Sequence, residues 1–327
     1  MTSAIEATLS ALLKGDRRIL AKTITLIESS LASHQQEAQA ILERLLPHTG
    51  KAIRLGITGV PGVGKSTFIE SLGTLLIEKG LKVAVLAVDP SSNRSGGSVL
   101  ADKTRMERLS ADKRAFIRPS PSGGTLGGVA RKTRETMLVC EAAGFDVTIV
   151  ETVGIGQSET TVASMVDFFL VLMLAGAGDE LQGIKKGFLE WADALAINKA
   201  DGNNVERAKM AQKDYATALH LLRPASTHWS PPVLLCSARE KTGIEAIWET
   251  VLKYREVMTA NGELAQRRRG QSLAWMWSLV EEGLRDRFNH HPEVQRQLPH
   301  LARQVESGQL PPAAAAGQLL ALLDRQR

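Results

Sequence analysis

Residues 53–68 read IRLGITGVPGVGKSTF, an apolar run that passes directly into a glycine-rich stretch. The part from Gly59 to Ser66 fits the G-x-x-x-x-G-K-[ST] pattern of a phosphate-binding loop between a buried strand and a helix. Its glycines permit backbone conformations that turn several N–H groups toward one anion, and a helix that begins near Lys65 adds its positive end. We therefore expect a strand–loop–helix unit that binds the phosphates of a nucleotide.

We expect every residue of this loop to contribute to the phosphate site. Lys65 would reach the β- and γ-phosphates, the Ser66 hydroxyl would bind Mg²⁺, and Thr67 would bond the α-phosphate. The alternative is a glycine-rich turn with an incidental Lys-Ser pair, which chance alone produces in roughly one chain in a hundred of this length. The predicted contacts are Gly59, Val60, Pro61, Gly62, Val63, Gly64, Lys65, Ser66 and Thr67.

Short apolar runs separated by helical stretches continue beyond this unit. They show no polar alternation, which is typical of parallel strands buried on both faces, and an aromatic content of only 4% leaves aliphatic residues to fill the core. We predict a doubly wound, mostly parallel α/β sheet, in which ligands bind at the carboxyl ends of the strands. The predicted strands are residues 53–58, 82–88, 115–118, 146–151, 168–175, 194–198 and 233–237.

Helical sequence flanks the predicted sheet on both sides, because apolar positions recur at helical spacing over residues 4–47 and again after residue 257. We expect an N-terminal helical extension over 1–50, a P-loop domain over 51–257 and a C-terminal helical arm over 258–327. One helix of the arm carries an apolar stripe, a feature that usually packs within its own chain. The stripe consists of Leu273, Met276, Trp277, Val280, Leu284 and Phe288.

A second motif, Asn198-Lys199-Ala200-Asp201, closes one of the predicted strands. A carboxylate at Asp201 accepts hydrogen bonds from N1–H and the exocyclic amine of guanine, whereas adenine offers neither donor there, so the motif favours GTP over ATP. Lys199 would lie along the base, and Asn198 would tie the loop to the phosphate site. Alone, the tetrapeptide is more often a strand-end turn. Its place between a phosphate loop and Ser237-Ala238, whose backbone suits guanine O6, favours base binding.

Acidic residues lie near the ends of other predicted strands. Asp89 and Glu151 each close a strand, Asp102 lies in a glycine-rich stretch, and Gly154 would offer its N–H to the γ-phosphate. Mg²⁺ needs hard oxygen ligands and usually keeps several waters, so one or two of these carboxylates suffice. Each acid taken alone is as often a turn or a helix cap. Their common setting favours metal binding and positioning of the attacking water.

The sequence also predicts how fast this site hydrolyses GTP. Many small GTPases carry a glutamine directly after the glycine of the last acidic stretch, where it orients the attacking water. Here that position is Ile155, and Gln157 lies two residues further on. We expect slow intrinsic hydrolysis that a partner, a second copy or a rearranged loop accelerates.

Charge and cysteine content argue against several other classes of protein. The 40 basic and 35 acidic residues are mixed, and the basic run Arg267-Arg268-Arg269 is interpreted as a solvated helix end or linker rather than a nucleic-acid patch. Cys140 and Cys236 have no CxxC partner, so a zinc site or disulfide framework is not expected. The longest apolar run, residues 168–175, is too short to cross a bilayer. We expect a cytoplasmic protein that binds neither nucleic acid nor a membrane.

Taken together, these motifs resemble the MeaB/ArgK-type P-loop GTPases of the SIMIBI class, which accompany adenosylcobalamin-dependent methylmalonyl-CoA mutase. The most specific feature is Glu151, which stands where most GTPases have Asp. The resemblance covers the whole predicted GTPase core, and the flanking helical ends have the right length. The matching stretches are residues 59–67, 88–92, 96–106, 151–159, 178–187 and 198–201.

The resemblance implies further roles. Asp89, Asp102 and Glu151 would be switch residues around Mg²⁺ and the hydrolytic water. Residues 177–186 would form an additional switch loop that relays the nucleotide state to the mutase, with Lys185 contacting the nucleotide side. The C-terminal helices would form a homodimer arm. The implied function is a GTPase chaperone that gates cobalamin delivery and protects or reactivates the mutase.

Three other classes remain as alternatives. A phosphotransferase, the older ArgK-type kinase assignment, would need an acceptor pocket with a catalytic base, and no such motif is present. A nickel-delivery GTPase would need clustered His and Cys ligands, whereas the seven histidines are scattered. A signal-recognition GTPase would need a Met-rich RNA-binding tail, whereas the entire chain has only eight methionines.

Overall fold

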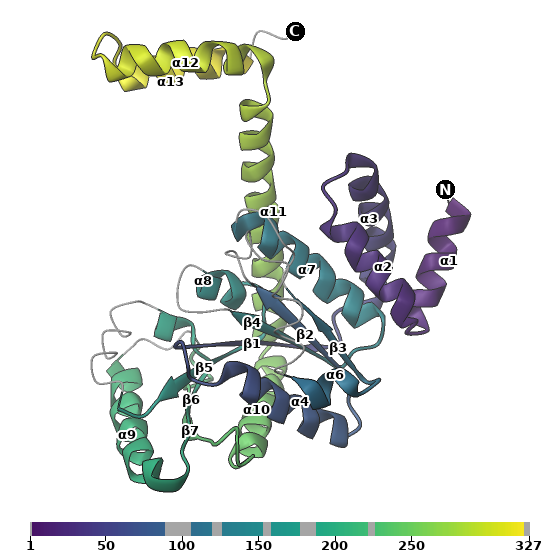
Figure 1. The fold of residues 1–327 in the computed structure, drawn as a ribbon, viewed down its shortest axis with the longest axis vertical. Coiled ribbons are helices and arrows are strands. Elements are labelled where there is room, and N and C mark those ends of the chain that lie inside the picture. The colour runs from purple at the N-terminus through teal and green to yellow at the C-terminus, as the bar shows by residue number, and fades with distance from the viewer. Residues whose placement is uncertain are drawn as a thin grey trace. The chain divides into compact units, whose positions relative to one another are not determined.

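The computed structural model describes residues 2–88, 106–119, 126–152, 158–176, 188–221 and 226–323 of the 327-residue chain (Figure 1). Contacts within the chain divide it into two compact units, Met1–Arg268 and Arg269–Arg327. The first unit holds the sheet and the helices that cover it, and the second holds the C-terminal helices. The three-part division at residues 50 and 257 stays a prediction.

The first unit is built on a seven-stranded sheet whose described strands all pair in parallel. The strand order is β3-β2-β4-β1-β5-β6-β7, so β1 lies in the middle, and the chain adds strands first on one side of it and then on the other. Such a reversal marks the crevice where doubly wound sheets bind ligands. The strands are β1 (Ile53–Gly59), β2 (Val83–Val88), β3 (Ala115–Arg118), β4 (Val147–Thr152), β5 (Phe168–Leu174), β6 (Ala194–Asn198) and β7 (Val233–Leu235).

All seven predicted strands are confirmed, and their ends differ from the prediction by at most two residues. The agreement has a physical cause: every residue of β4 and β6 is buried, as is all of β5 except its last residue. Strands covered on both faces are apolar along most of their length and are therefore easy to recognise. The predicted α/β fold class is confirmed.

Neighbouring side chains pack against β1 closely enough to require glycine at position 56. A Cβ at Gly56 would lie 2.8 Å from a ring carbon of Phe169 and 2.9 Å from a methyl of Val166. Overpacking of this kind displaces neighbouring elements. The helices that cover the sheet are α4 (Lys65–Glu78), α7 (Leu126–Ala142), α8 (Ser158–Ala163), α9 (Val205–Leu221) and α10 (Ile244–Ala260), with a short α6 (Glu107–Ala111) beside α4.

Three N-terminal helices, α1 (Thr2–Leu13), α2 (Arg17–Glu28) and α3 (Ala32–Leu45), pack against α7 (Figure 1). They share with α7 a second apolar cluster, separate from the core around β1. Asp16 caps α2, because its carboxylate accepts the backbone N–H of Arg18 at 2.9 Å and that of Ile19 at 3.1 Å. Arg17 donates to the carbonyl of Ala115 at 2.7 Å, so the start of α2 also contacts the edge strand β3.

The second unit begins inside helix α11 (Glu263–Asn289) and also contains α12 (Pro292–Glu306) and α13 (Pro312–Ala321). The predicted apolar stripe on α11 is exposed in the single chain, from 41% at Val280 to 61% at Trp277. Phe288, its last member, is half-buried. No helix among the described residues is both long and apolar enough to cross a membrane.

The basic run at residues 267–269 differs from the predicted solvated helix end. Arg267 pairs with Asp193, with 3.0 Å between Nη1 and Oδ1, and Arg268 pairs with Asp167, with 2.6 Å between Nη2 and Oδ2. Both carboxylates are buried, and of the three arginines only Arg269 is exposed. A planar guanidinium suits paired hydrogen bonds to a carboxylate, which holds such side chains in place. The solvated interpretation is therefore wrong for Arg267 and Arg268.

Candidate functional site

The predicted phosphate loop connects the end of β1 at Gly59 to the start of α4 at Lys65. Gly62 and Gly64 have φ angles of 76° and 94°, a left-handed region that disfavours residues with a Cβ. A Cβ at Gly59 would lie 2.5 Å from the carbonyl oxygen of Leu172 in the neighbouring strand. The glycines thus fix the loop at the middle of the sheet, with the N-terminus of α4 behind it.

Lys65 lies in the first turn of α4, and its Nζ donates to the carbonyl of Gly59 at 2.9 Å. The side chain is buried. Burial lowers the pKa of Lys65, and the negative charges of Glu151 and Glu159 oppose this shift. An ammonium group held in a partly desolvated loop interacts more strongly with an anion than the same group in water.

The predicted base-binding motif follows β6 and contacts the phosphate loop directly. The amide Nδ2 of Asn198 donates to the carbonyl of Val63 at 2.7 Å, and Nζ of Lys199 donates to the carbonyl of Gly62 at 2.8 Å. Asn198 is fully buried, and its Oδ1 accepts the backbone N–H of Ala238 at 3.0 Å. Three segments that are distant in sequence therefore meet at one place, as the motifs predict for a nucleotide site.

Asp201 lies at the start of the turn η5 (Gly202–Asn204), and the buried hydroxyl of Ser237 donates to its Oδ2. The same hydroxyl accepts the backbone N–H of Glu240 at 3.1 Å, which fixes its direction. Ser71 of α4 donates to the carbonyl of Ala238 at 2.6 Å and so joins this last loop to the helix behind the phosphate site. The carboxylate expected to bind guanine is thus held in one orientation.

Cys236 belongs to the same network, because its Sγ lies 3.6 Å from Oδ1 of Asn198. Burial raises the pKa of Cys236 to about 12. At pH 8 only about one thiol in 10⁴ is then ionised, and the thiolate is the reactive form. We expect Ellman's reagent to react with native Cys236 more than about 100-fold slower than with the denatured chain.

Cys140 provides an internal control for this measurement. It is buried under the N-terminal helices, far from the loops that contact Asn198 in the sequence, and burial also raises its pKa. Added GTP should slow the labelling of Cys236 further and leave that of Cys140 unchanged, since a ligand suppresses local opening of the loops that it binds. Equal protection of both thiols by GTP would contradict this placement of Cys236.

Glu151 lies in β4 next to the phosphate loop. The Ser66 hydroxyl donates to its Oε1 at 3.3 Å, and the carboxylate is buried. A hydroxyl and a carboxylate oxygen in contact form a hard-oxygen donor pair, the ligand type that Mg²⁺ takes, so these residues fit the predicted ion. Among the described residues there is no group of three or more His, Cys, Asp or Glu that would hold a metal. Four other predicted residues lie outside the described residues: Asp89, Asp102, Gly154 and Lys185.

Glu159 is an acid to which the sequence motifs assigned no role. It lies in the first turn of α8 and is only 2% exposed, and its charge acts on Lys65 together with that of Glu151. The sequence signal for a site residue was its position shortly after a strand and a glycine-containing segment. That pattern does not show that the Glu159 side chain is buried. The phosphate site therefore has two buried carboxylates near one ammonium group.

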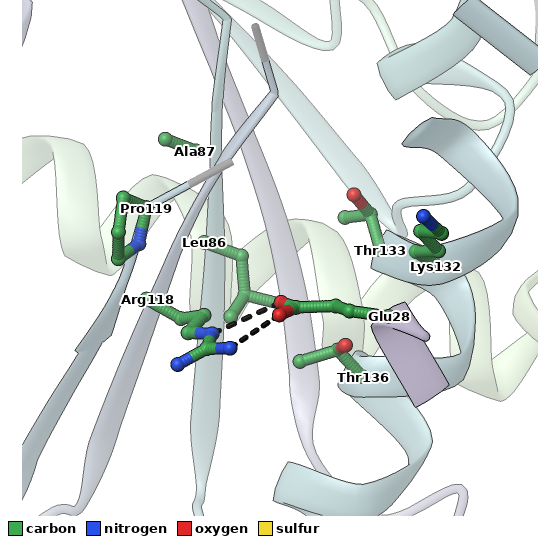
Figure 2. A pocket seen from close by; sticks show the side chains of 8 residues that line it. All are labelled: Glu28, Leu86, Ala87, Arg118, Pro119, Lys132, Thr133 and Thr136. Atoms are coloured by element: carbon green, nitrogen blue, oxygen red, sulfur yellow. Dashed lines mark hydrogen bonds and ion pairs between the residues drawn. The ribbon is translucent and has the colours of Figure 1, made fainter. Parts of the chain in front are cut away.

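A small pocket, partly open to solvent, lies elsewhere at the carboxyl ends of β2 and β3 (Figure 2). Arg118 from the end of β3 reaches Glu28 at the end of α2, with 2.9 Å between Nε and Oε1, and Thr133 and Thr136 of α7 line the opposite side. Strand β4 separates β2 from β1 in the sheet. The pocket therefore belongs to the junction with the N-terminal helices and not to the phosphate loop.

Comparison with known proteins agrees with this arrangement of motifs. The family described as "Methylmalonyl Co-A mutase-associated GTPase MeaB" matches residues 20–293. A relative from Caulobacter vibrioides is 58% identical over 310 residues, 95% of each chain. The protein named "GTPase ArgK" from Escherichia coli (strain K12) is 48% identical over 325 residues, 98% of each chain.

A solved structure extends the similarity to the whole fold. The crystal structure titled "LAO/AO transport system kinase" is 41% identical, covers 99% of both chains and superposes with a TM-score of 0.80. Family and fold thus agree over the phosphate loop, the guanine motif and the flanking helices. The chain belongs to the MeaB/ArgK family of P-loop GTPases that are associated with methylmalonyl-CoA mutase.

Proposed function

We propose that this GTPase binds GTP with Mg²⁺ and uses its hydrolysis to gate cobalamin loading into an adenosylcobalamin-dependent methylmalonyl-CoA mutase, and to protect or reactivate that enzyme. The observation that carries the nucleotide part is the direct contact between the phosphate loop and the base motif through Asn198 and Lys199. The mutase part rests on the family to which the chain belongs.

Each residue of the site has a proposed role. The loop from Gly59 to Thr67 binds the phosphates, Asp201 reads guanine, and the loop at Ser237 and Ala238 contacts guanine O6. Bound Mg²⁺ would offset charge on the β- and γ-phosphates, with Ser66 as the protein ligand that the P-loop pattern specifies. Glu151, Asp89 and Asp102 hold that ion or the attacking water. Gly154 contacts the γ-phosphate, and Lys185 contacts the nucleotide side.

Hydrolysis by the isolated protein is proposed to be slow, because Ile155 stands where many small GTPases carry the water-orienting glutamine. The test is single-turnover hydrolysis of γ-labelled GTP by the purified chain, alone and with a purified methylmalonyl-CoA mutase in its apo and cobalamin-loaded forms. We expect faster phosphate release with the mutase and a complex whose affinity differs between GDP and a non-hydrolysable GTP analogue. No complex in any nucleotide state would remove the chaperone role and leave the GTPase assignment in place.

The same experiment distinguishes the alternative of a phosphotransferase. A kinase would transfer the label to a protein or small molecule, whereas a GTPase releases it as free phosphate. In the pocket at the junction with α2, Glu28 is paired with Arg118, so this carboxylate is not free to act as the base that a phosphate acceptor would need (Figure 2). We therefore favour hydrolysis.

We also propose that the chain forms a homodimer through α11. Exposed apolar residues on one helix face mark an interaction surface when they form a continuous stripe, and Trp residues often dominate such interfaces. Met276 and Trp277 are 46% and 61% exposed in the single chain. The two cysteines are buried and free, which fits a reducing compartment, and we propose a cytoplasmic location.

Replacement of Trp277 by Glu should break this dimer, because it removes a large apolar contact and places a charge in the seam. Wild-type protein should elute at twice the 35.4 kDa chain mass in light scattering, and Trp277→Glu at the single mass. Ser278→Glu is the matched control, since Ser278 is exposed on the same helix but outside the stripe. A monomeric wild-type protein at micromolar concentration would refute the dimer.

A further inference from the structure

Two adjacent arginines of α11 join the amino ends of three central strands. Arg268 donates from Nε to Oδ1 of Asp167 at 2.7 Å and from Nη2 to the carbonyl of Ala52 at 2.8 Å. Arg267 donates from Nη1 and Nη2 to the two oxygens of Asp193, at 3.0 and 3.1 Å. Ala52, Asp167 and Asp193 directly precede β1, β5 and β6.

The two aspartates also bond neighbouring strands to each other. Oδ2 of Asp167 accepts the backbone N–H of Arg54 in β1 at 2.9 Å, and Oδ2 of Asp193 accepts the backbone N–H of Phe169 in β5 at 2.8 Å. Each carboxylate therefore connects two adjacent strands. Because the arginines bind both carboxylates, they hold the amino ends of β1, β5 and β6 in a defined position relative to the first turns of α11.

Arg267 also contacts helix α10. Its Nη1 donates to the hydroxyl of Tyr254 at 2.6 Å, and the Tyr254 ring is in edge-to-face contact with Trp229, with 5.1 Å between ring centres. Trp229 in turn donates from its indole nitrogen to the carbonyl of Asp193 at 2.7 Å. A natural tryptophan thus lies beside the Arg267–Asp193 ion pair.

The carboxyl ends of the same three strands lead into the nucleotide-binding elements. Strand β1 ends at the phosphate loop, β6 ends at the base motif, and β5 lies between β1 and β6. A seven-residue strand spans about 23 Å. Buried strands that are hydrogen-bonded on both sides move as stiff elements, because a close-packed interior transmits displacement instead of absorbing it. A shift of one strand at the nucleotide therefore appears at its amino end.

We propose that Arg267 and Arg268 are positioning residues that couple the nucleotide state to helix α11. This inference rests on the proposed GTP cycle. A relative shift of β1, β5 or β6 between the GTP and GDP states changes the spacing of the two aspartates, and paired hydrogen bonds at 2.6–3.1 Å tolerate little displacement. Movement of the aspartates would therefore move the first turns of α11. This helix extends to Asn289 and so includes the start of the second unit.

The test uses full-length protein labelled with 5-fluorotryptophan and ¹⁹F NMR, with the five resonances assigned by Trp→Phe variants. Calorimetry first establishes that GTP and GDP bind, and failure at that step contradicts the proposed function itself. We expect the Trp229 resonance and that of Trp275 on α11 to shift when a non-hydrolysable GTP analogue replaces GDP. Binding of both nucleotides with no shift at either position would overturn this inference alone.

The variant Arg268→Lys keeps the charge and removes the two-pronged geometry. We expect it to reduce the nucleotide-dependent shift of Trp275 by more than half and to change the GTP-to-GDP affinity ratio about fivefold, since coupling between two sites is reciprocal. Arg269→Lys, an exposed neighbour on the same helix, should behave as wild type. A variant that is less stable but keeps the wild-type shift and affinity ratio would make the ion pair a structural clamp only. If Arg268→Lys does not fold, the same Trp275 shift and affinity ratio are measured on Arg267→Lys and compared with those of the wild type.

Discussion

Replacement of Asp201 by asparagine is expected to transfer the base preference of this protein from guanine to xanthine. The wild-type carboxylate accepts two hydrogen bonds, from N1–H and from the exocyclic amine of guanine. An asparagine amide offers one acceptor and one donor. Xanthine carries a carbonyl oxygen where guanine carries the amine, so this oxygen accepts a hydrogen bond from the asparagine NH₂. With guanine, the exocyclic amine faces the asparagine NH₂, and two donors oppose each other.

The structure determines which way the new amide turns. The Ser237 hydroxyl donates to Oδ2 of Asp201, and its own direction is fixed by the backbone N–H of Glu240. An asparagine at this position must therefore turn its oxygen toward Ser237 and its NH₂ toward the base. Each unpaired buried group costs about 1–3 kcal/mol, so GTP affinity should fall about 10²- to 10³-fold.

The measurement is calorimetric titration of wild type and Asp201→Asn with GTP, XTP and ATP in the presence of magnesium. XTP should become the tightest ligand of the variant, and ATP should bind weakly to both proteins. Asp214→Asn is the matched control, because Asp214 is an exposed carboxylate on α9. If Asp201→Asn keeps the GTP affinity of the wild type, residue 201 does not read the base.

Replacement of Lys65 by methionine should nearly abolish hydrolysis and strongly weaken nucleotide binding. Methionine keeps the volume of the side chain and removes the ammonium group, which donates to Gly59 in the phosphate loop. The buried Glu151 and Glu159 then lose their favourable interaction with the Lys65 ammonium group. A triphosphate would meet these two buried negative charges without the positive charge of Lys65.

Loss of one well-placed donor to a transition state typically lowers the rate about 10²- to 10³-fold, and we expect at least this loss for Lys65→Met. The assay is single-turnover GTP hydrolysis at saturating enzyme, with separate titrations of GTP and GDP. GTP affinity should fall more than GDP affinity, because Lys65 is expected to contact the γ-phosphate, which GDP lacks. The isolated protein should also unfold at lower denaturant concentration, since each of the two buried acids loses one favourable interaction with a cation.

Lys79→Met provides the control at the C-terminal end of the same helix. Lys79 lies directly after the last residue of α4, and its partner Glu245 is exposed to solvent. Exposed ion pairs contribute little, so this variant should bind and hydrolyse GTP as the wild type does. Equal loss in both variants would indicate damage to α4 as a whole and would contradict a specific role for Lys65.

The parts that the sequence predicted well are those in which the signal is local. Most of the seven strands are largely apolar because the central part of the sheet is covered on both faces, and the predicted boundaries hold to within two residues. The phosphate loop and the base motif each lie within a few residues of a strand end. Since parallel strands bring their carboxyl ends to one edge, the motifs had to meet there once the strands were placed.

Predictions that depended on distant partners were weaker. Arg267 and Arg268 look like a solvated basic run, but their carboxylate partners lie 74 and 101 residues earlier in the chain. The exposure of a basic side chain depends on which acid the fold brings beside it, and no local pattern contains that information. Glu159 was missed for a related reason, because its burial beside Lys65 depends on how α8 packs on β4 and β1.

The sequence alone therefore determined the fold class, the order of the nucleotide-binding motifs and the family, because each depends on residue types at fixed short spacings. Only the tertiary structure decided how Ser237 orients Asp201, which acids surround Lys65, and how α11 is anchored to the base of the sheet. Those interactions join segments far apart in the chain. Their geometry exists only after the core has packed, because burial and close-packed neighbours hold charged side chains in a single arrangement.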